Sequence, residues 1–468
     1  MLLRQNVSFL MFPFTLMRRG DNTDVGLDGF RMPANALWKP AQMNVEADVF
    51  FAHIQSFLQK SVDGKTDGEK EISACDFMVY SCVSEKLNQW LFNAENVYEL
   101  QLKNRSLHFS FYNDRQSFLS PKLVVYPDAS VGLLMLPVSL KEPRVDMKML
   151  MNFNYHVQKL AKQKKLIVLT GPERAVDGWR KNTSSLGESF YLADLVDYLL
   201  KSLNDAYPWQ LFTPRRCHVF SYFNVCQEEV ERAEAVEWKD DLLRIARCQN
   251  SDYQVMPQDD AVKQTFRNVY IAVNVEGGAM MTMGNLQFYQ EFMTNNLVQR
   301  YLWLYVLVFI QRYSLINMAR GIGAIDNDGD RKNIVSLKRL RSLSDHLTRI
   351  KVNSYFSDVS DYTQHNEFYH FCCKRLGVVR LLADVEQKMQ TLDDCLRQKV
   401  EQRNEFMQLM LTIFVIFLTL FSGINDGLQL SDRDFFSFVG GEISLWVGRL
   451  LFACGIAAVL LIVLRRKK

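Results

Sequence analysis

Residues 406–424 read FMQLMLTIFVIFLTLFSGI, a stretch without a charged side chain. A second apolar stretch, ISLWVGRLLFACGIAAVLLIVL at 443–464, has Arg449 as its one charged residue. Each is close to the ~20 residues that a helix needs to cross the hydrocarbon core of a membrane. The sequence therefore predicts a hairpin of two transmembrane helices, 406–424 and 443–464, joined by a loop at 425–442.

Basic residues flank this hairpin on the same side. Arg397, Lys399 and Arg403 precede the first span, and the tail 465–468 reads RRKK. Cytoplasmic flanks of membrane spans are enriched in Lys and Arg. Residues 1–19 lack the layout of a signal peptide. We therefore expect a multi-pass protein of an inner (plasma) membrane, with both termini in the cytoplasm.

The predicted outer loop, 425–442, is acidic. It has four carboxylates against Arg433, a net charge of −3. If several copies surrounded one axis, these carboxylates would form a ring that concentrates cations at an outer mouth. The alternative is an ordinary solvated loop.

The remaining composition is that of a mainly water-soluble chain. Mean hydropathy is −0.11 and net charge is +3 over 468 residues, so a large nucleic-acid surface is not expected. The nine cysteines include no Cys-x-x-Cys pattern, which favours reduced buried thiols. The sequence shows no nucleophile motif or paired-carboxylate site, and it gives no reason to expect an enzyme. No metal site is assigned.

A long helix is predicted ahead of the first span. No proline occurs in 361–424 and only Gly377 interrupts the helix-forming residues. Apolar residues follow one another in steps of three and four, at Leu382, Val385, Met389, Leu392 and Leu396. This pattern predicts a stalk helix at 361–405 that continues into the span, roughly 95 Å in all. Because one helix cannot bury such a stripe alone, self-assembly around an axis is expected.

The region before the stalk is expected to be an α/β domain, residues 1–284, followed by a helical connector at 285–360. Strand-turn-strand-helix patterns at 123–138 and 268–283 predict two related, ferredoxin-like halves. Further strands are expected at 7–16, 107–112 and 218–225, and connector helices at 286–319 and 333–351 around a linker at 321–330. The apolar run 301–310 is too short to span a membrane and predicts a buried helix.

Two places in this domain have residues suited to an anionic ligand. Arg215 and Arg216 precede the 218–225 strand, an arrangement that suits phosphate. The turn at 276–278 contains glycines that let backbone approach a ligand. The predicted binding residues are Arg215, Arg216, His218, Asn154, Lys159, Glu276, Gly277 and Gly278. The alternative for each is ordinary surface or turn chemistry.

The order of these parts resembles the CorA superfamily of divalent-cation transporters. The resemblance is best over 361–468. It implies a funnel of five subunits, a homo-pentamer, in which the first span lines the pore and Mg²⁺ is the transported ion. The family's Gly-Met-Asn motif has Gly423-Ile424-Asn425 as its nearest counterpart, and an alternative alignment puts it at Asp426-Gly427-Leu428. The pore residues implied are Ile413, Ile416, Gly423, Asn425 and Asp426.

The large N-terminal domain is more similar to the CorA-like effectors of type III CRISPR antiviral defence. That likeness implies a channel opened by a nucleotide second messenger, an S-adenosylmethionine–AMP conjugate, bound to the cytoplasmic domain. Two alternatives remain. One is a housekeeping Mg²⁺ or Zn²⁺ transporter gated by its own ion. The other is a membrane-tethered interaction protein without a pore.

Overall fold

The structure is a computed structural model that describes the chain with gaps. The described residues are 1–17, 27, 30–33, 37–41, 49–51, 54, 78–82, 87–88, 91–93, 95–102, 106–114, 119–160, 167–169, 189–204, 206–225, 235–253, 260–327, 333–354 and 356–431. Of these, 169, 235–237, 325–327, 333–339, 352–354, 421 and 423–431 are described by their backbone alone. The chain divides into two compact units, Met1–Asp393 and Asp394–Lys468.

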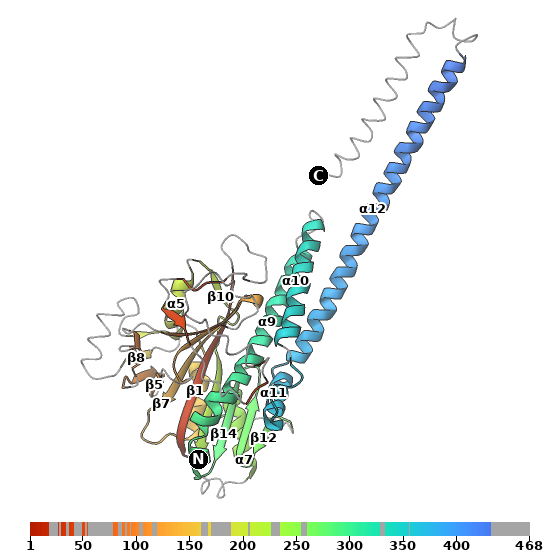
Figure 1. The fold of residues 1–468 in the computed structure, drawn as a ribbon. Coiled ribbons are helices and arrows are strands. Elements are labelled where there is room, and N and C mark those ends of the chain that lie inside the picture. The colour runs from red at the N-terminus through yellow and green to blue at the C-terminus, as the bar shows by residue number, and fades with distance from the viewer. Residues whose placement is uncertain are drawn as a thin grey trace, which may run out of the picture. The chain divides into compact units, whose positions relative to one another are not determined.

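One sheet forms the centre of the first unit (Figure 1). Its strands are β1 (Leu3–Leu16), β2 (Trp38–Pro40), β3 (Met78–Cys82), β4 (Tyr98–Gln101), β5 (Ser106–Phe111), β6 (Lys122–Tyr126), β7 (Val131–Leu140), β8 (Ile167–Leu169), β9 (Ser189–Phe190), β10 (Trp209–Leu211), β11 (His218–Val225), β12 (Val262–Phe266), β13 (Val269–Val273) and β14 (Gly277–Met283). The main path runs β12-β13-β14-β11-β1-β7-β5-β4-β8-β9. Among the described strands, β11 and β14 make the one parallel pair. The α/β prediction for the N-terminal region is confirmed.

The two predicted strand-turn-strand units belong to this same sheet. β6 with β7, and β13 with β14, are antiparallel hairpins. β11 and β1 lie between them in the strand order. One edge of β7 has two partners in turn: Val131–Met135 pairs with β6, and Val138–Leu140 pairs with β5. The halves therefore share one core instead of forming separate sheets.

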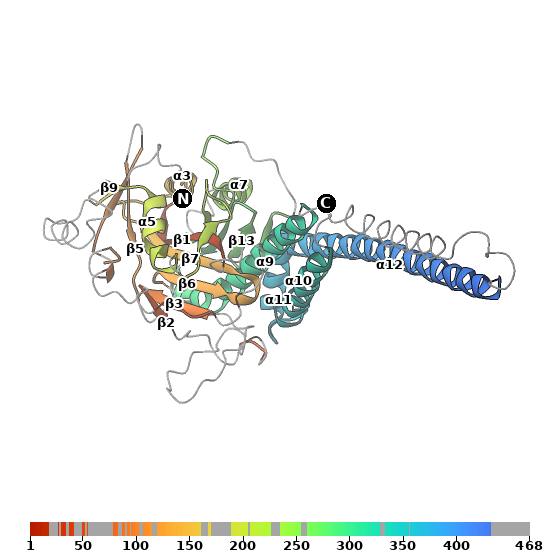
Figure 2. The same ribbon diagram turned by 90° about the horizontal axis from the view of Figure 1, so that it is seen from above.

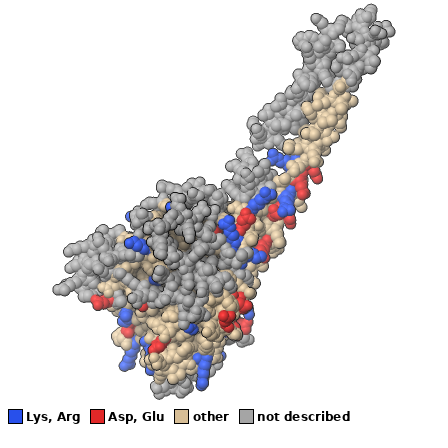
Figure 3. Space-filling model, viewed as in Figure 1, with Lys and Arg blue, Asp and Glu red and all other residues tan. Residues whose placement is uncertain are grey.

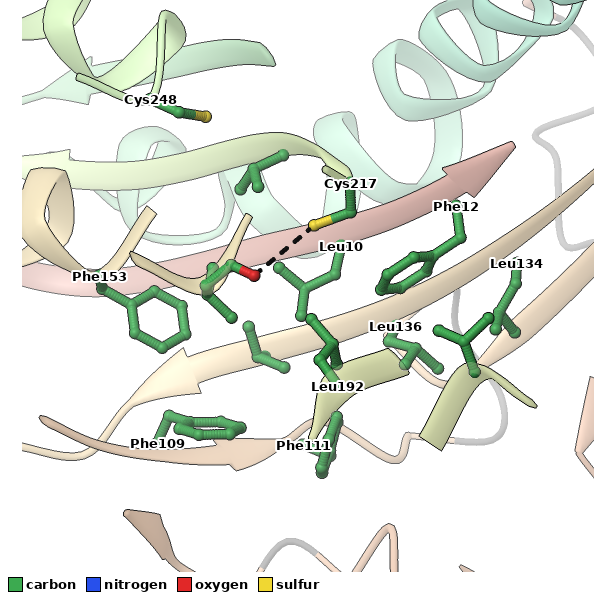
Figure 4. Close-up of a cluster of buried hydrophobic side chains, with 14 of the residues drawn as sticks. Leu10, Phe12, Phe109, Phe111, Leu134, Leu136, Phe153, Leu192, Cys217 and Cys248 are labelled. Atoms are coloured by element: carbon green, nitrogen blue, oxygen red, sulfur yellow. Dashed lines mark hydrogen bonds between the residues drawn. The ribbon is translucent and has the colours of Figure 1, made fainter. Parts of the chain in front are cut away.

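Strand β1 is central because both of its faces are apolar. Its even-numbered side chains, such as Leu10 and Phe12, enter the core that α3 (Met147–Val157), α5 (Leu192–Leu200) and α7 (Ala235–Ala246) cover. Figure 4 shows them among the following side chains: Phe109, Phe111, Leu134, Leu136, Phe153 and Leu192. A strand buried on both faces reads as a continuous apolar run, which explains VSFLMFPFTL. Pro13 lies where the partner of β1 changes from β11 to β10.

A long apolar helix covers the other face of the sheet. It is α9 (Leu302–Asn327), which follows α8 (Gln287–Gln290) and the π-helix η3 (Met293–Tyr301). Tyr305 of α9 packs on Phe220 of β11, with ring centroids 4.3 Å apart. The first unit thus has three layers, with helices on both sides of the central strands (Figure 2). Burial of the 301–310 run is confirmed, but its helix continues through the predicted linker to Asn327.

The predicted stalk helix is interrupted. Helix α11 (Thr363–Arg375) ends before Gly377, and α12 (Val378–Ser431) begins after it. Gly377 has a φ of +70°, a left-handed conformation that favours glycine at a helix end. The prediction of one unbroken helix from Asp361 is therefore wrong, and the continuous helix starts at Val378.

The apolar stripe of the stalk is partly covered within a single chain. Val385 and Met389 are 0% and 8% exposed. Lys351 of α10 (Asn333–Ser354) forms an ion pair with Glu386 of α12, so these two helices are neighbours. Val385 and Met389 are therefore buried without further copies of the chain, contrary to our expectation for this stripe.

Among the described residues, two helical stretches are long and apolar enough to cross a membrane, by length and composition alone. In Met293–Ala324, 83% of the apolar window is buried inside the molecule, as expected for a core helix. In Val378–Leu420 the corresponding value is 0%. Figure 3 shows charged atoms along the lower part of α12 and none on its upper described part. The α12 backbone also continues beyond the predicted end of the first span at Ile424 to Ser431. The predicted second span and basic tail lie outside the described residues.

A buried lysine in β6 should make stability depend on pH. Lys122 is 4% exposed and donates to the Ser81 hydroxyl over 2.7 Å. Burial lowers the pKa of Lys122 from its ordinary 10.5 to about 8, and Asp114 opposes this shift. Between these two values the unfolded chain binds more protons than the folded one, so stability rises with pH. Below pH 8 Lys122 is charged in the folded protein as well, and the gain in stability from its neutral form is lost.

Lys122→Met is therefore expected to stabilise the protein by about 1–3 kcal/mol at pH 7 and to remove the rise between pH 8 and 10.5. Denaturant midpoints measured from pH 7 to 10.5 test this, with Lys141→Met at an exposed position as the control. A less stable Lys122→Met protein with an unchanged pH slope would contradict the prediction.

Candidate functional site

The parallel pairing of β11 with β14 brings most of the predicted binding residues together. In this register Val219 lies opposite Gly277 and Phe220 opposite Gly278. The segment before β11 contains Arg215 and Arg216, and the segment before β14 contains Glu276. Both segments therefore meet at the amino ends of the two strands.

The end of α3 is fixed against the same place by backbone hydrogen bonds. The Leu160 amide donates to the Arg215 carbonyl over 3.1 Å, and the Cys217 amide donates to the Gln158 carbonyl over 2.8 Å. Lys159 and Arg216 face each other across this short antiparallel bridge. The Lys159 ammonium lies 3.5 Å from the centre of the Tyr155 ring, a cation–π contact. Lys159 and the two arginines thus share one surface.

The turn after α7 packs beneath this surface. Gln158 donates its side-chain amide to the Cys248 carbonyl over 2.9 Å. Burial raises the pKa of the Cys248 thiol to about 12; the Glu276 charge adds to this shift and the Arg216 charge opposes it. Both charges therefore act on one buried thiol. Cys248 has a φ of +49°.

The two glycines of β14 are required by packing. A Cβ on Gly277 would lie 2.5 Å from the Val219 carbonyl oxygen. A Cβ on Gly278 would lie 2.9 Å from the Tyr305 hydroxyl. Both glycines are buried, whereas Glu276 is exposed. Their role is thus to let strands and helices approach closely, which differs from the flexible turn that we predicted.

His218 and Asn154 point into the interior and not toward the exposed arginines. His218 is bonded to the Val275 carbonyl at 3.2 Å and to the Tyr305 hydroxyl at 2.5 Å. Burial lowers the pKa of His218 to about 3, with a further contribution from Arg312, so the ring is neutral at pH 7. Asn154 donates to the Ser221 hydroxyl over 2.8 Å and accepts from Ser8 over 3.3 Å. These two residues join sheet and helices.

The structure adds arginines that the sequence did not indicate. Arg375 of α11 donates to the Val273 carbonyl over 3.0 Å and to the Asn274 side-chain oxygen over 2.7 Å. Burial, followed by the Arg247 charge, lowers the pKa of Arg375, while Asp260 raises it. Arg312 of α9 acts on the His218 ring. Around the 273–277 turn lie four residues, hereafter the arginine group: Arg216, Arg247, Arg312 and Arg375.

The arginine group has the chemistry of an anion site. Guanidinium groups bind phosphate and carboxylate through two parallel hydrogen bonds. Two acidic residues act here: the Glu276 charge acts on the neighbouring Cys248, and the Asp260 charge acts on Arg375. Asp260 is also paired with Lys374 at 3.1 Å, on a side chain that is 75% exposed. Among the described residues, positive charge therefore predominates around the turn.

No protein-family model and no curated protein matches this chain. Its chemistry must therefore be inferred from the residues themselves. No sequence pattern indicated the arginine group, because Arg247 follows α7, Arg312 belongs to α9 and Arg375 ends α11. Only Arg215 and Arg216 stood beside a recognisable strand.

The arginine group is connected to the start of α12. Arg312 donates to the Leu376 carbonyl, one residue before Gly377. Arg375 stands at the end of α11 and holds the 273–277 turn, as described above. Arg375 thus ties the end of α11 to the turn, and Arg312 ties the residue before Gly377 to α9.

The predicted pore residues all lie on α12. Ile413 and Ile416 are each 52% exposed. Gly423, Asn425 and Asp426 belong to the last turns of the α12 backbone, and their side chains lie outside the described residues. Within the described part of the chain, no group of three or more His, Cys, Asp or Glu residues could hold a metal ion.

Proposed function

We propose that this protein is a homo-oligomeric, CorA-like membrane channel for divalent cations, opened by a nucleotide that binds its cytoplasmic domain. The observation that supports this most is the continuity of α12. This helix runs from the arginine-held joint at Gly377 into the exposed apolar residues 407–420. A continuous helix transmits displacement along its length, so a ligand at one end can act on the membrane segment.

The arginine group supports an anionic ligand with phosphate. Arg216 is exposed beside Lys159 and is open to a phosphate, whereas Arg375 is already bonded to a carbonyl and an amide oxygen of the 273–277 turn. The likeness to effectors of type III CRISPR systems favours an S-adenosylmethionine–AMP conjugate. We infer that ligand binding at Arg216 shifts the 273–277 turn, and that Arg375, which is bonded to this turn, passes the shift to the joint at Gly377.

Arg216→Gln is expected to weaken nucleotide binding by about tenfold or more, because one charge-assisted contact to phosphate is lost. Calorimetry on the full-length protein in detergent, with the S-adenosylmethionine–AMP conjugate, AMP and ATP, measures this. Arg341→Gln, at an exposed position of α10, is the matched control and should bind normally. Equal affinities of the two variants would remove Arg216 from the site.

Flux into liposomes tests the channel itself. Liposomes containing a Mg²⁺ indicator should fill when the nucleotide is added to the reconstituted protein. Mg²⁺ or Zn²⁺ flux without any nucleotide would favour a transporter gated by its own ion. A monomer in mild detergent, without flux, would favour a membrane-tethered interaction protein, since one subunit cannot enclose a pathway.

A further inference from the structure

Two lysines and a serine form one row across three neighbouring strands of the sheet. In the antiparallel pairing of β2 with β3, Lys39 lies opposite Ser81, and in the pairing of β3 with β6, Ser81 lies opposite Lys122. Figure 2 shows these three strands side by side. Residues directly opposite each other in an antiparallel pair have their side chains on the same face, with Cβ atoms about 4.5–5.5 Å apart. The three polar side chains therefore share one face of the sheet.

The serine hydroxyl and the amine of the inner lysine are in direct contact. The Ser81 Oγ and Lys122 Nζ atoms are 2.7 Å apart. Exposure increases along the row, since Lys122 is buried, Ser81 is partly exposed and Lys39 is exposed. A small molecule therefore reaches Ser81 from the Lys39 side, and Lys122 lies on the inner side of the serine.

Lys122 has the properties of a general base. Burial lowers its pKa to about 8, and Asp114 opposes this shift, so about half of the Lys122 side chains are neutral at pH 8. A neutral amine accepts the proton of a hydroxyl that is bonded to it, and a base is most effective when its pKa is close to the working pH. A serine hydroxyl is a weak nucleophile until such a base activates it, and lysine fills this role on several unrelated folds.

The energetic cost of Lys122 supports a chemical role for it. An apolar side chain at this position should make the domain more stable at pH 7, as argued above for Lys122→Met. Residues that conflict with the rules of a stable core are expected at functional sites. No motif in the sequence marks this row, because its three residues belong to three separate strands that meet only in the sheet.

We propose that Ser81 is the nucleophile of an esterase site, with Lys122 as its general base and the Lys39 ammonium as the cation that stabilises the oxyanion. In the first step, the Ser81 oxygen bonds to the ester carbonyl carbon and its proton passes to Lys122. The bond to the leaving alcohol then breaks, and the alcohol departs with that proton. In the second step, water attacks the acyl-serine and gives a proton to Lys122, which returns it to the departing Ser81 oxygen. One ester and one water thus become one carboxylic acid and one alcohol.

A fluorescent fluorophosphonate, which bonds covalently to activated serine hydroxyls, tests this assignment on the full-length protein in detergent. Peptide mass spectrometry locates the adduct, and hydrolysis of p-nitrophenyl acetate is followed in parallel. We expect an adduct on Ser81 that forms faster as the pH rises from 6.5 to 9, with half the maximal rate near pH 8. Ser81→Ala should abolish the adduct and the ester hydrolysis. Ser139→Ala, which removes a hydroxyl that donates to Asn6, is the matched control and should retain both.

Substitutions of the two lysines separate their roles. Lys122→Met and Lys122→Arg should each lower the labelling rate about 100-fold or more, because neither side chain can take up a proton at pH 8. Lys39→Gln, at an exposed position, should lower it about fivefold or more, whereas Lys39→Arg keeps the charge and most of the rate. Lys141→Met, at another exposed position, should label normally.

Lack of an adduct at Ser81 throughout pH 6.5–9 would overturn the proposal, and so would an unchanged labelling rate in Lys122→Met. An unchanged rate in Lys39→Gln would remove Lys39 from the site. All of these measurements are made without a nucleotide or a membrane potential, so their outcome is independent of the proposed channel function.

Discussion

Replacement of Gly277 by alanine is expected to destabilise the soluble domain by about 2–4 kcal/mol. The new Cβ would lie 2.5 Å from the Val219 carbonyl oxygen and 2.8 Å from the Ala246 carbonyl oxygen. Both obstacles are backbone atoms, which cannot rotate away as a side chain can. Val219 is also held opposite Gly277 by the β11–β14 pairing. The two strands would have to separate where the arginine group is assembled.

Gly323 provides the control for this substitution. It lies inside α9, and a Cβ there would meet no atom within 4 Å. Alanine favours the helix over glycine by up to about 1 kcal/mol, so Gly323→Ala should be neutral or stabilising. Thermal midpoints of both variants in the same detergent decide the comparison. If both variants melt at the temperature of the unsubstituted protein, the close packing of Gly277 has no energetic weight.

Removal of the Arg375 guanidinium should separate ligand binding from channel opening. In Arg375→Met, the contacts to Val273 and Asn274 are lost, and the joint at Gly377 no longer responds to the turn. We expect nucleotide-activated flux to fall by about tenfold or more, whereas the affinity for the nucleotide changes by less. Flux and calorimetry on the same preparation measure the two effects.

Lys374→Met is the matched control, because it changes the neighbouring residue of the same helix. Its ion pair with Asp260 joins side chains that are 71% and 75% exposed, and such pairs contribute little. Flux through this variant should be normal. A parallel loss of affinity and flux in Arg375→Met would mean that Arg375 binds the ligand and does not transmit its effect.

Local patterns in the sequence predicted much of the fold. The strands at 7–16, 107–112 and 218–225 are apolar runs with β-forming residues, and they correspond to β1, β5 and β11. The buried helix around 301–310 also followed from its composition. The break at Gly377 was not predicted, since a single glycine inside a helical pattern indicates either a tolerated residue or a helix end.

The candidate site was less predictable because it depends on contacts between distant segments. Arg216 stood out beside a strand, but Arg312 and Arg375 reach the 273–277 turn only after α9 and α11 pack on the sheet. The same packing buries His218, which the sequence had placed with the arginines. The pairing of β11 with β14, which joins the site, connects residues about 60 positions apart.

The central position of β1 affects how the chain folds while it is being synthesised. Leu3 pairs with Val225, so β1 must wait about 10–45 s for β11 at ordinary rates of translation. The strands that α9 covers, however, all leave the ribosome before α9 does. Although α9 is apolar enough to be mistaken for a membrane span, the sheet on which it packs is already synthesised when it emerges, whereas the apolar window of Val378–Leu420 is not buried against the described residues.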